Sequence, residues 1–272
     1  MNATIRACAS LFKIRVAENL QYRAAAVAGA SIGVFWVAIN ITVFTIFFTY
    51  GNILDRTVLT LPQVISYEWL GQVLFAMNYL NIDDMLRTKI VNGDIGVELC
   101  RPVDFYTYWF TQTSAGRIGG SLWRMLLTLA VGILIPAPYG LALPASGAGF
   151  MLFLITATGS YLLCISYTML ITAVRLGITW GEGPVYMLAL FGMVLGGGYL
   201  PLQLWPDFMQ KFLLIQPFAG YMDIPLRLYI GSMSVSEALP AIGLQFFWII
   251  VFLTAGKLLM TRKLKNIIVQ GG

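Results

Sequence analysis

The sequence predicts an all-α polytopic membrane protein with six transmembrane helices, and three observations support this fold class. Hydrophobic residues make up 58% of the 272 residues and charged residues only 11%, whereas about a quarter of a soluble domain is charged. The mean hydropathy is +0.79. The apolar residues form runs close to the roughly 20 residues that a helix needs to cross a bilayer, and the whole chain reads as one transmembrane domain over residues 1–272.

Residues 2–23 are predicted to form an amphipathic helix. Ile5, Phe12, Val16 and Leu20 fall near one face of this helix, and Arg and Lys side chains supply positive charge elsewhere on it. A basic amphipathic helix that precedes a span lies along the membrane surface. We therefore expect this helix in the cytosolic interface, and a removable secretory signal is the alternative.

Six apolar runs are predicted as transmembrane helices. The first is too long for a signal peptide, whose apolar core has about 7–15 residues. The second is diluted by Gln63, Glu68, Gln72 and Asn78, so one of its sides should face protein rather than lipid. The third is the later part of a longer helix over 103–135 that starts with aromatic residues, as is typical of a membrane interface. The six spans cover residues 24–50, 62–82, 117–135, 147–174, 184–198 and 239–260.

The distribution of basic residues predicts the topology. Most of them fall in the N-terminal helix, in a charged connector over 83–102, in a turn over 175–183 and after the sixth span, and Arg117 is counted with them. Cytosolic segments of membrane proteins carry an excess of Lys and Arg. Both termini are therefore predicted to be cytosolic. Only three basic residues fall on the predicted outer side: Arg56, Lys211 and Arg227.

Residues 199–237 do not fit a simple span. Prolines divide the segment, and short helices are expected to start near Pro206 and Pro225. Each helix would carry an acid and a base four residues apart on one face, namely Asp207 with Lys211 and Asp223 with Arg227. We expect a re-entrant or interfacial hairpin on the outer side, where protein or a wet cavity must surround any non-helical backbone. The alternative is an ordinary outside loop with surface salt bridges.

The composition also excludes several chemistries. The chain has no histidine, which removes His-based proton relays, His metal sites and Ser-His or Cys-His nucleophiles. Cys8, Cys100 and Cys164 lack metal-like spacing and are expected to be packing residues. The net charge of +5 is attributed to the positive-inside bias and not to nucleic-acid binding, because the basic residues lie at loop ends. No metal and no bound cofactor is expected on this chain.

Two unusual segments carry a family resemblance. The stretch N-G-D-I-G-V-E-L-C-R-P-V-D-F at 92–105 resembles the cytosolic connector of ABC type-2 permeases, in the branch related to daunorubicin-resistance export permeases. The later stretches L-G-G-G-Y-L-P-L-Q-L-W-P-D-F at 195–208, Q-P-F-A-G-Y at 216–221 and P-L-R-L-Y-I-G at 225–231 resemble the outer hairpin of the same branch. The resemblance covers nearly the whole chain. It implies the permease subunit of an ATP-driven exporter in a bacterial plasma (inner) membrane.

The resemblance further implies that the connector is a coupling helix that docks on a separate ABC ATPase subunit, present in two copies. The chain has no G-x-x-x-x-G-K-[ST] phosphate loop, and its nearest fragment, Gly256-Lys257, is followed by leucine. ATP and Mg are therefore expected on the partner. A cytosolic loop folded for its own sake is the alternative. The expected contact residues are Gly93, Asp94, Ile95, Glu98, Leu99, Arg101 and Pro102.

A permease with six spans is also expected to need a second permease to enclose a path. Small residues four apart let helices approach closely in a bilayer, and Gly29 with Gly33 and Gly192 with Gly196 have this spacing. These pairs lie in spans 1 and 5, which form the dimer contact in the family. A dissimilar second permease is expected, and a homodimer remains open. Packing within the chain is the alternative explanation for each pair.

Arg124 lies inside the third predicted span. A lone arginine in the hydrocarbon costs about 2.5–3.5 kcal/mol on insertion scales, so its side chain should face protein or water. It could snorkel to the inner headgroups, pair with Asp83 or Asp84, or line the path and attract an anionic group of the cargo.

A secondary transporter or channel without an ATPase is the alternative function. Such proteins tend to carry intramembrane carboxylates or inverted repeats, whereas the acids here are expected at span ends and no clear repeat is present. A membrane enzyme is a weaker third hypothesis, because the sequence shows no nucleophile–base pair.

Overall fold

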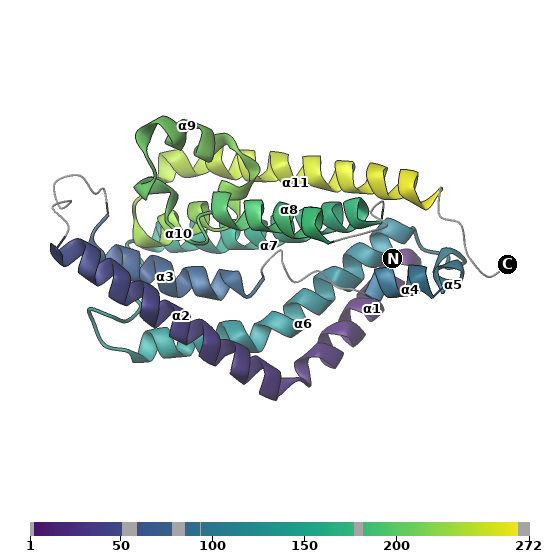
Figure 1. Cartoon of the computed structure of the whole chain (residues 1–272), viewed down its shortest axis with the longest axis horizontal. Helices are drawn as coiled ribbons and strands as arrows, with labels where there is room; N and C mark the ends of the chain where they lie inside the picture. The colour runs from purple at the N-terminus through teal and green to yellow at the C-terminus, as the bar shows by residue number, and fades with distance from the viewer. Residues whose placement is uncertain (1–2, 51–58, 78–84, 93, 177–181, 266–272) are drawn as a thin grey trace.

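The computed structural model describes residues 3–50, 59–77, 85–92, 94–176 and 182–265. Within these residues the chain is helical and contains no strand (Figure 1). Four of the described helices are long and apolar enough to cross a membrane: α2 (Arg23–Tyr50), α6 (Phe105–Leu134), α7 (Gly147–Arg175) and α11 (Val235–Leu264). The predicted all-α membrane class is confirmed, and the count of six spans stays a prediction.

The second and fifth predicted spans are shorter helices. They correspond to α3 (Leu61–Phe75), with 15 residues, and α8 (Gly183–Leu195), with 13 residues. At about 1.5 Å per residue both fall short of the roughly 30 Å hydrocarbon core. The end of the second predicted span, 78–82, lies outside the described residues. Eight of the 15 residues of α3 are buried within the chain, which agrees with the prediction that one side of this span faces protein.

The N-terminal helix α1 (Ala3–Leu20) packs along the first half of α6. Val16 and Leu20 of the predicted apolar face are half-buried, whereas Ile5 is exposed. The two helices approach closely at Gly119, where an added Cβ would lie 2.8 Å from the carbonyl oxygen of Val16. The helix is confirmed, and much of its apolar face is covered by protein. Its position in the cytosolic interface stays a prediction.

Helix α7 forms the centre of the bundle, in contact with α11, α6, α8 and α10. It supplies Leu163, Tyr167 and Ile171 to the largest apolar core cluster. A buried polar clamp from α11 crosses this core: the Gln245 side chain donates hydrogen bonds to the carbonyl of Thr156 on α7, at 3.0 Å, and to that of Gly220, at 2.7 Å. Because the two carbonyls belong to different segments of the chain, these bonds fix the position of α11 relative to both segments.

The connector and the hairpin lie at opposite ends of the bundle (Figure 1). The connector contains α4 (Met85–Val91) and α5 (Ile95–Leu99), near the start of α1 and the end of α11. The other end carries α9 (Asp207–Ile215) and α10 (Asp223–Ile230), with the 3₁₀ turns η1 (Leu202–Leu204) and η2 (Pro217–Gly220). This arrangement agrees with a connector and a hairpin on different sides of a membrane.

The two predicted hairpin helices are present and differ in burial. Helix α9 is largely exposed, with Phe208 82% accessible and only Leu213 fully buried among its described side chains, whereas almost every residue of α10 is buried against α7 and α3. Asp223 is fully buried, 3.7 Å from Arg227, so the alternative of an outside loop with a surface pair is wrong for α10. The side chain of Asp207 lies outside the described residues.

Asp223 ties the hairpin to α3 and to η1. Its Oδ1 accepts hydrogen bonds from the Tyr67 hydroxyl, at 3.3 Å, and from the Leu202 N–H, at 3.1 Å. This hairpin lies outside the four candidate spans. Burial raises the pKa of Asp223 to about 6, although the Arg227 guanidinium opposes this shift.

Helix α8 is held at both ends. Before its first residue, Glu182 forms an ion pair with Arg175 at the end of α7, with 2.9 Å between Oε2 and Nε. At its other end the Gln216 side chain donates to the Leu195 carbonyl, at 2.8 Å, and the Asp223 N–H donates to the Gly196 carbonyl, at 3.2 Å. These bonds join α8 to α7 on one side and to the hairpin on the other.

Candidate functional site

The connector is anchored by a buried carboxylate. The Glu98 side chain is 1% exposed and forms ion pairs with Lys89 on α4 and with Arg101, whose Nε lies 3.0 Å from Oε2. Arg101 also stacks over the Tyr108 ring of α6, with 4.6 Å to the centroid. Ile95 is fully buried in a core cluster that includes Trp109. These contacts fix α5 against the first turns of α6.

A second polar contact links the start of α6 to α11. Asp104 caps α6 by accepting from the Thr107 N–H, at 3.1 Å, and its Oδ2 lies 3.4 Å from Lys257 Nζ. Partial burial raises the pKa of Asp104, but the bonds from Thr107 and the Lys257 charge outweigh it and leave this pKa below its ordinary value. The carboxylate therefore stays charged at neutral pH and holds α6 and α11 together beside the connector.

The connector presents a short apolar surface beyond this anchored base. Val97 is 70% exposed and Leu99 is 49% exposed. Asp94, Arg101 and Pro102 surround them and are also exposed. We call these five residues the connector surface. The predicted contact set therefore divides: Asp94, Leu99, Arg101 and Pro102 are accessible, Ile95 and Glu98 face inward, and Gly93 lies outside the described residues.

Val97 was missing from the predicted contact set. Its signal in the sequence is an apolar residue next to acidic Glu98 in a connector expected to be cytosolic. Exposed apolar side chains of this kind mark protein or membrane contacts when they cluster.

The glycines predicted at a permease dimer contact all pack within the chain. An added Cβ at Gly29 would lie 2.8 Å from Arg124 Nε, and one at Gly33 would lie 2.7 Å from Gln72 Nε2. Gly192 is buried, and an added Cβ at Gly196 would lie 3.2 Å from the carbonyl oxygen of Phe218. Internal packing therefore accounts for the spacing, and the dimer contact stays a prediction.

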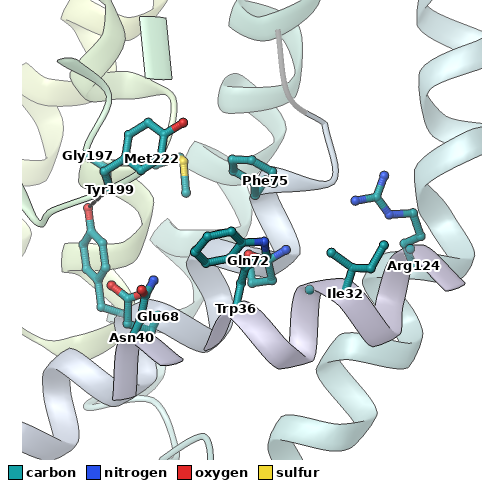
Figure 2. A pocket seen from close by; sticks show the side chains of 15 residues that line it. Ile32, Trp36, Asn40, Glu68, Gln72, Phe75, Arg124, Gly197, Tyr199 and Met222 are labelled. Carbon is teal, nitrogen blue, oxygen red and sulfur yellow. Dashed lines mark hydrogen bonds between the residues drawn. The ribbon is translucent and has the colours of Figure 1, made fainter. Parts of the chain in front are cut away.

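A cavity of about 300 Å³ lies between α2, α3, α6 and the segment after α8. Figure 2 shows charged side chains near its two ends: Arg124 at one end and Glu68 with Asn40 at the other. Asn40 Nδ2 donates to Glu68 Oε2 at 2.7 Å. Glu68 is the eighth residue of α3, so this acid lies inside its helix and is an exception to the expected clustering of acids at span ends.

Arg124 lines this cavity and is half-buried. Among the described residues it has no hydrogen bond or ion pair. Its proposed partners Asp83 and Asp84 lie outside the described residues, so that pairing is untested. The interpretation in which Arg124 lines a path agrees with its position, since its side chain borders the cavity beside Gly29.

Arg117 has a structural position that the sequence did not predict. It was counted with the cytosolic basic residues, but its side chain is buried between α3 and α7. Its guanidinium donates to the Met77 carbonyl, at 2.8 Å, and to the Thr168 hydroxyl, at 3.1 Å. A positive charge at the carboxyl end of a helix is favourable, and Met77 lies two residues after the end of α3, next to its C-cap Ala76. Arg117 therefore stabilises the end of this short helix.

A helical bundle with four candidate spans and a charged cavity among them is typical of a membrane transport protein. A family model described as ABC-2 family transporter protein matches residues 34–271. The match covers most of the chain, so the protein belongs to the ABC-2 transporter family, and the predicted permease class is confirmed. Permeases of this family generally work with an ABC ATPase partner. No curated protein and no solved structure matches the chain.

Proposed function

We propose that this chain is the membrane permease subunit of an ATP-driven exporter in a bacterial plasma membrane. A separate ABC ATPase subunit, in two copies, would bind ATP and Mg and dock on the connector. A second permease, dissimilar or identical, would complete the path. The branch related to daunorubicin-resistance permeases, the six spans and the cytosolic termini belong to the same proposal.

The connector surface is the observation that carries this proposal. Val97 and Leu99 are exposed on a base held by the Glu98 ion pairs and by buried Ile95. A rigid connector can transmit a displacement caused by a docked partner to α6, because Arg101, two residues after α5, stacks on Tyr108 of α6. An apolar centre with a charged rim is also the usual anatomy of a protein interface.

Replacing either exposed apolar residue by a charge is expected to release the ATPase. Val97→Asp or Leu99→Asp should lower the amount of copurifying Walker-motif ATPase about tenfold or more, since a loss of about 1.4 kcal/mol in binding is tenfold in affinity. Leu143→Asp is the matched control, because Leu143 is 90% exposed at the other end of the bundle. Copurification that is equal in all three variants and in the wild type would rule out this docking surface.

Cysteine labelling tests the proposed topology. In a cysteine-free background, Ser146→Cys at the start of α7 should react with a membrane-impermeant maleimide added to intact cells. Thr88→Cys on α4 should react only after permeabilisation, because α4 belongs to the connector. Labelling of Thr88→Cys in intact cells would reverse the orientation.

Secondary transport remains the second candidate, and Glu68 is the observation that favours it. A carboxylate inside a membrane segment commonly marks an ion or proton pathway. Transport by the isolated chain that continues when no ATPase copurifies would support this candidate over the ATP-driven one.

A further inference from the structure

The cavity between α2, α3 and α6 carries an acidic and a basic side chain that do not form an ion pair with each other. Glu68 accepts one hydrogen bond, from Asn40, and Arg124 has no partner within the described part of the chain. Arg124 lies beside Gly29, whereas Glu68 is bonded to Asn40, eleven residues further along α2. At about 1.5 Å per residue, the two charged groups are roughly 16 Å apart along the helix axis. They are therefore too far apart to form an ion pair.

The wall between the charges is mostly apolar. Ile32, Trp36 and Phe75 line it, and Gln72 is the polar side chain that lies between the charged ends in Figure 2. Ile32 and Trp36 are more than half exposed, so the cavity is open along α2. A molecule lying along the cavity would contact a carboxylate at one end, an apolar stretch in the middle and a guanidinium at the other end.

We propose that this cavity binds an elongated amphipathic zwitterion. Its cationic group would lie at Glu68, where the second carboxylate oxygen can accept from an amine. Its anionic group would lie at Arg124, whose guanidinium can donate to a carboxylate or phosphate in a forked geometry. Its apolar middle would cover Ile32, Trp36 and Phe75.

A ligand with both charges compensates both walls of the cavity. A ligand with one charge leaves either Glu68 or Arg124 without a counter-charge in a poorly hydrated site, which is unfavourable. The cavity therefore selects for the pair of charges and for their separation, and not for charge alone. Calling this ligand the cargo rests on the proposed function, but its binding to the chain does not.

Three probes that share a twelve-carbon chain test this selection. They are 12-aminododecanoic acid, with both charges, dodecanoic acid, with the anion alone, and dodecylamine, with the cation alone. Equilibrium dialysis against the whole chain in lipid nanodiscs, corrected with protein-free nanodiscs, gives each affinity. We expect the zwitterion to bind about tenfold or more tightly than either singly charged probe, because hydrogen bonds to charged groups contribute roughly 1.5–3 kcal/mol. Equal affinities for the three probes in the wild type would overturn the proposal, whatever the variants do.

Two variants assign the charges to their ends. Glu68→Gln retains the length of the side chain and should reduce zwitterion binding to the level of dodecanoic acid. Arg124→Gln should reduce it to the level of dodecylamine. Glu18→Gln and Arg262→Gln are matched changes at exposed residues outside the cavity and should leave binding unchanged. Zwitterion binding that survives both cavity variants would contradict the assignment.

The binding test can fail independently of the proposed function. It is carried out without an ATPase, so loss of binding selectivity leaves the docking prediction at Val97 and Leu99 untouched. Conversely, a chain that captures no ATPase but binds the zwitterion selectively retains the cavity proposal and loses only the ATP-driven mechanism. The two charges of phosphatidylethanolamine lie within one headgroup. If this lipid, added to the nanodisc, competed with the zwitterion, the cavity would not require two widely separated charges.

Discussion

Glu98→Lys is expected to release the connector from the bundle. The substitution replaces a carboxylate that is 1% exposed with a cation between Lys89 and Arg101. A buried charge without a counter-charge costs about 3–5 kcal/mol, and the new lysine would be such a charge, beside two other cations. The local stability of α4 and α5 should fall by this amount. Limited proteolysis should cut the connector faster, and the amount of bound ATPase should fall with it.

Asp94→Lys is the matched control for this charge reversal. Asp94 precedes α5, is exposed and forms no side-chain capping bond. Surface substitutions of this kind usually change stability by no more than about 0.5 kcal/mol. Asp94→Lys should therefore leave proteolysis of the connector unchanged while altering the charge of the connector surface. If both variants were cut at the wild-type rate, Glu98 would not anchor the connector.

Asp223→Ala is expected to destabilise the hairpin by about 3–5 kcal/mol, the range for leaving a buried charge unpaired. Arg227, with 12% of its side chain exposed, would lose its counter-charge, and the Leu202 N–H would lose its acceptor. Asp223→Asn retains an acceptor for Leu202 and Tyr67 and should lose less. Thermal unfolding and hydrogen exchange of α10 compare the two variants. Equal loss in both would mean that the charge, and not the acceptor, is decisive.

The same residue predicts a pH dependence. The pKa of Asp223 is about 6 in the folded protein, above the ordinary value of 3.8. The folded state therefore binds this proton more tightly than the unfolded state, and the resulting stabilisation is complete below about pH 4 and is lost as the pH rises through about 6. Relative to Asp223→Asn, the wild type should lose thermal stability between these values. A difference between the two that stays constant with pH would argue against this titration.

The long helices were predictable because local signals agree with the hydrophobic runs. Ser146 and Asp104 both accept a backbone hydrogen bond at the start of their helices, and α7 and α6 begin within one or two residues of the predicted positions. The end of α3 was not predictable in the same way. The helix stops at Phe75, and Arg117 binds the Met77 carbonyl just beyond it, which is a contact across forty residues of sequence.

The sequence predicted which segment forms the candidate site, but it did not predict which side chains of that segment are exposed and which are buried. The connector was identified, but the inward direction of Glu98 depends on how α4 folds back to bring Lys89 to it. Asn40 and Glu68 are polar residues in two different spans, and nothing local shows that they form a hydrogen bond. The glycine spacing at Gly29 and Gly33 was real, but it makes room for Arg124 and Gln72 of the same chain. Tertiary contacts decided each of these cases.

The bonds at both ends of α8 make this short helix a strut. It is clamped to α7 through Arg175 and Glu182, and its other end is clamped to the hairpin through Gln216 and Asp223. A strut with fixed ends transmits displacement without changing its own length. A rotation of α7 at the connector end would therefore move α8 and, through it, α10 at the opposite end of the bundle. Asp223 of α10 is bonded to Tyr67, which lines the cavity, so the same movement would change the cavity wall.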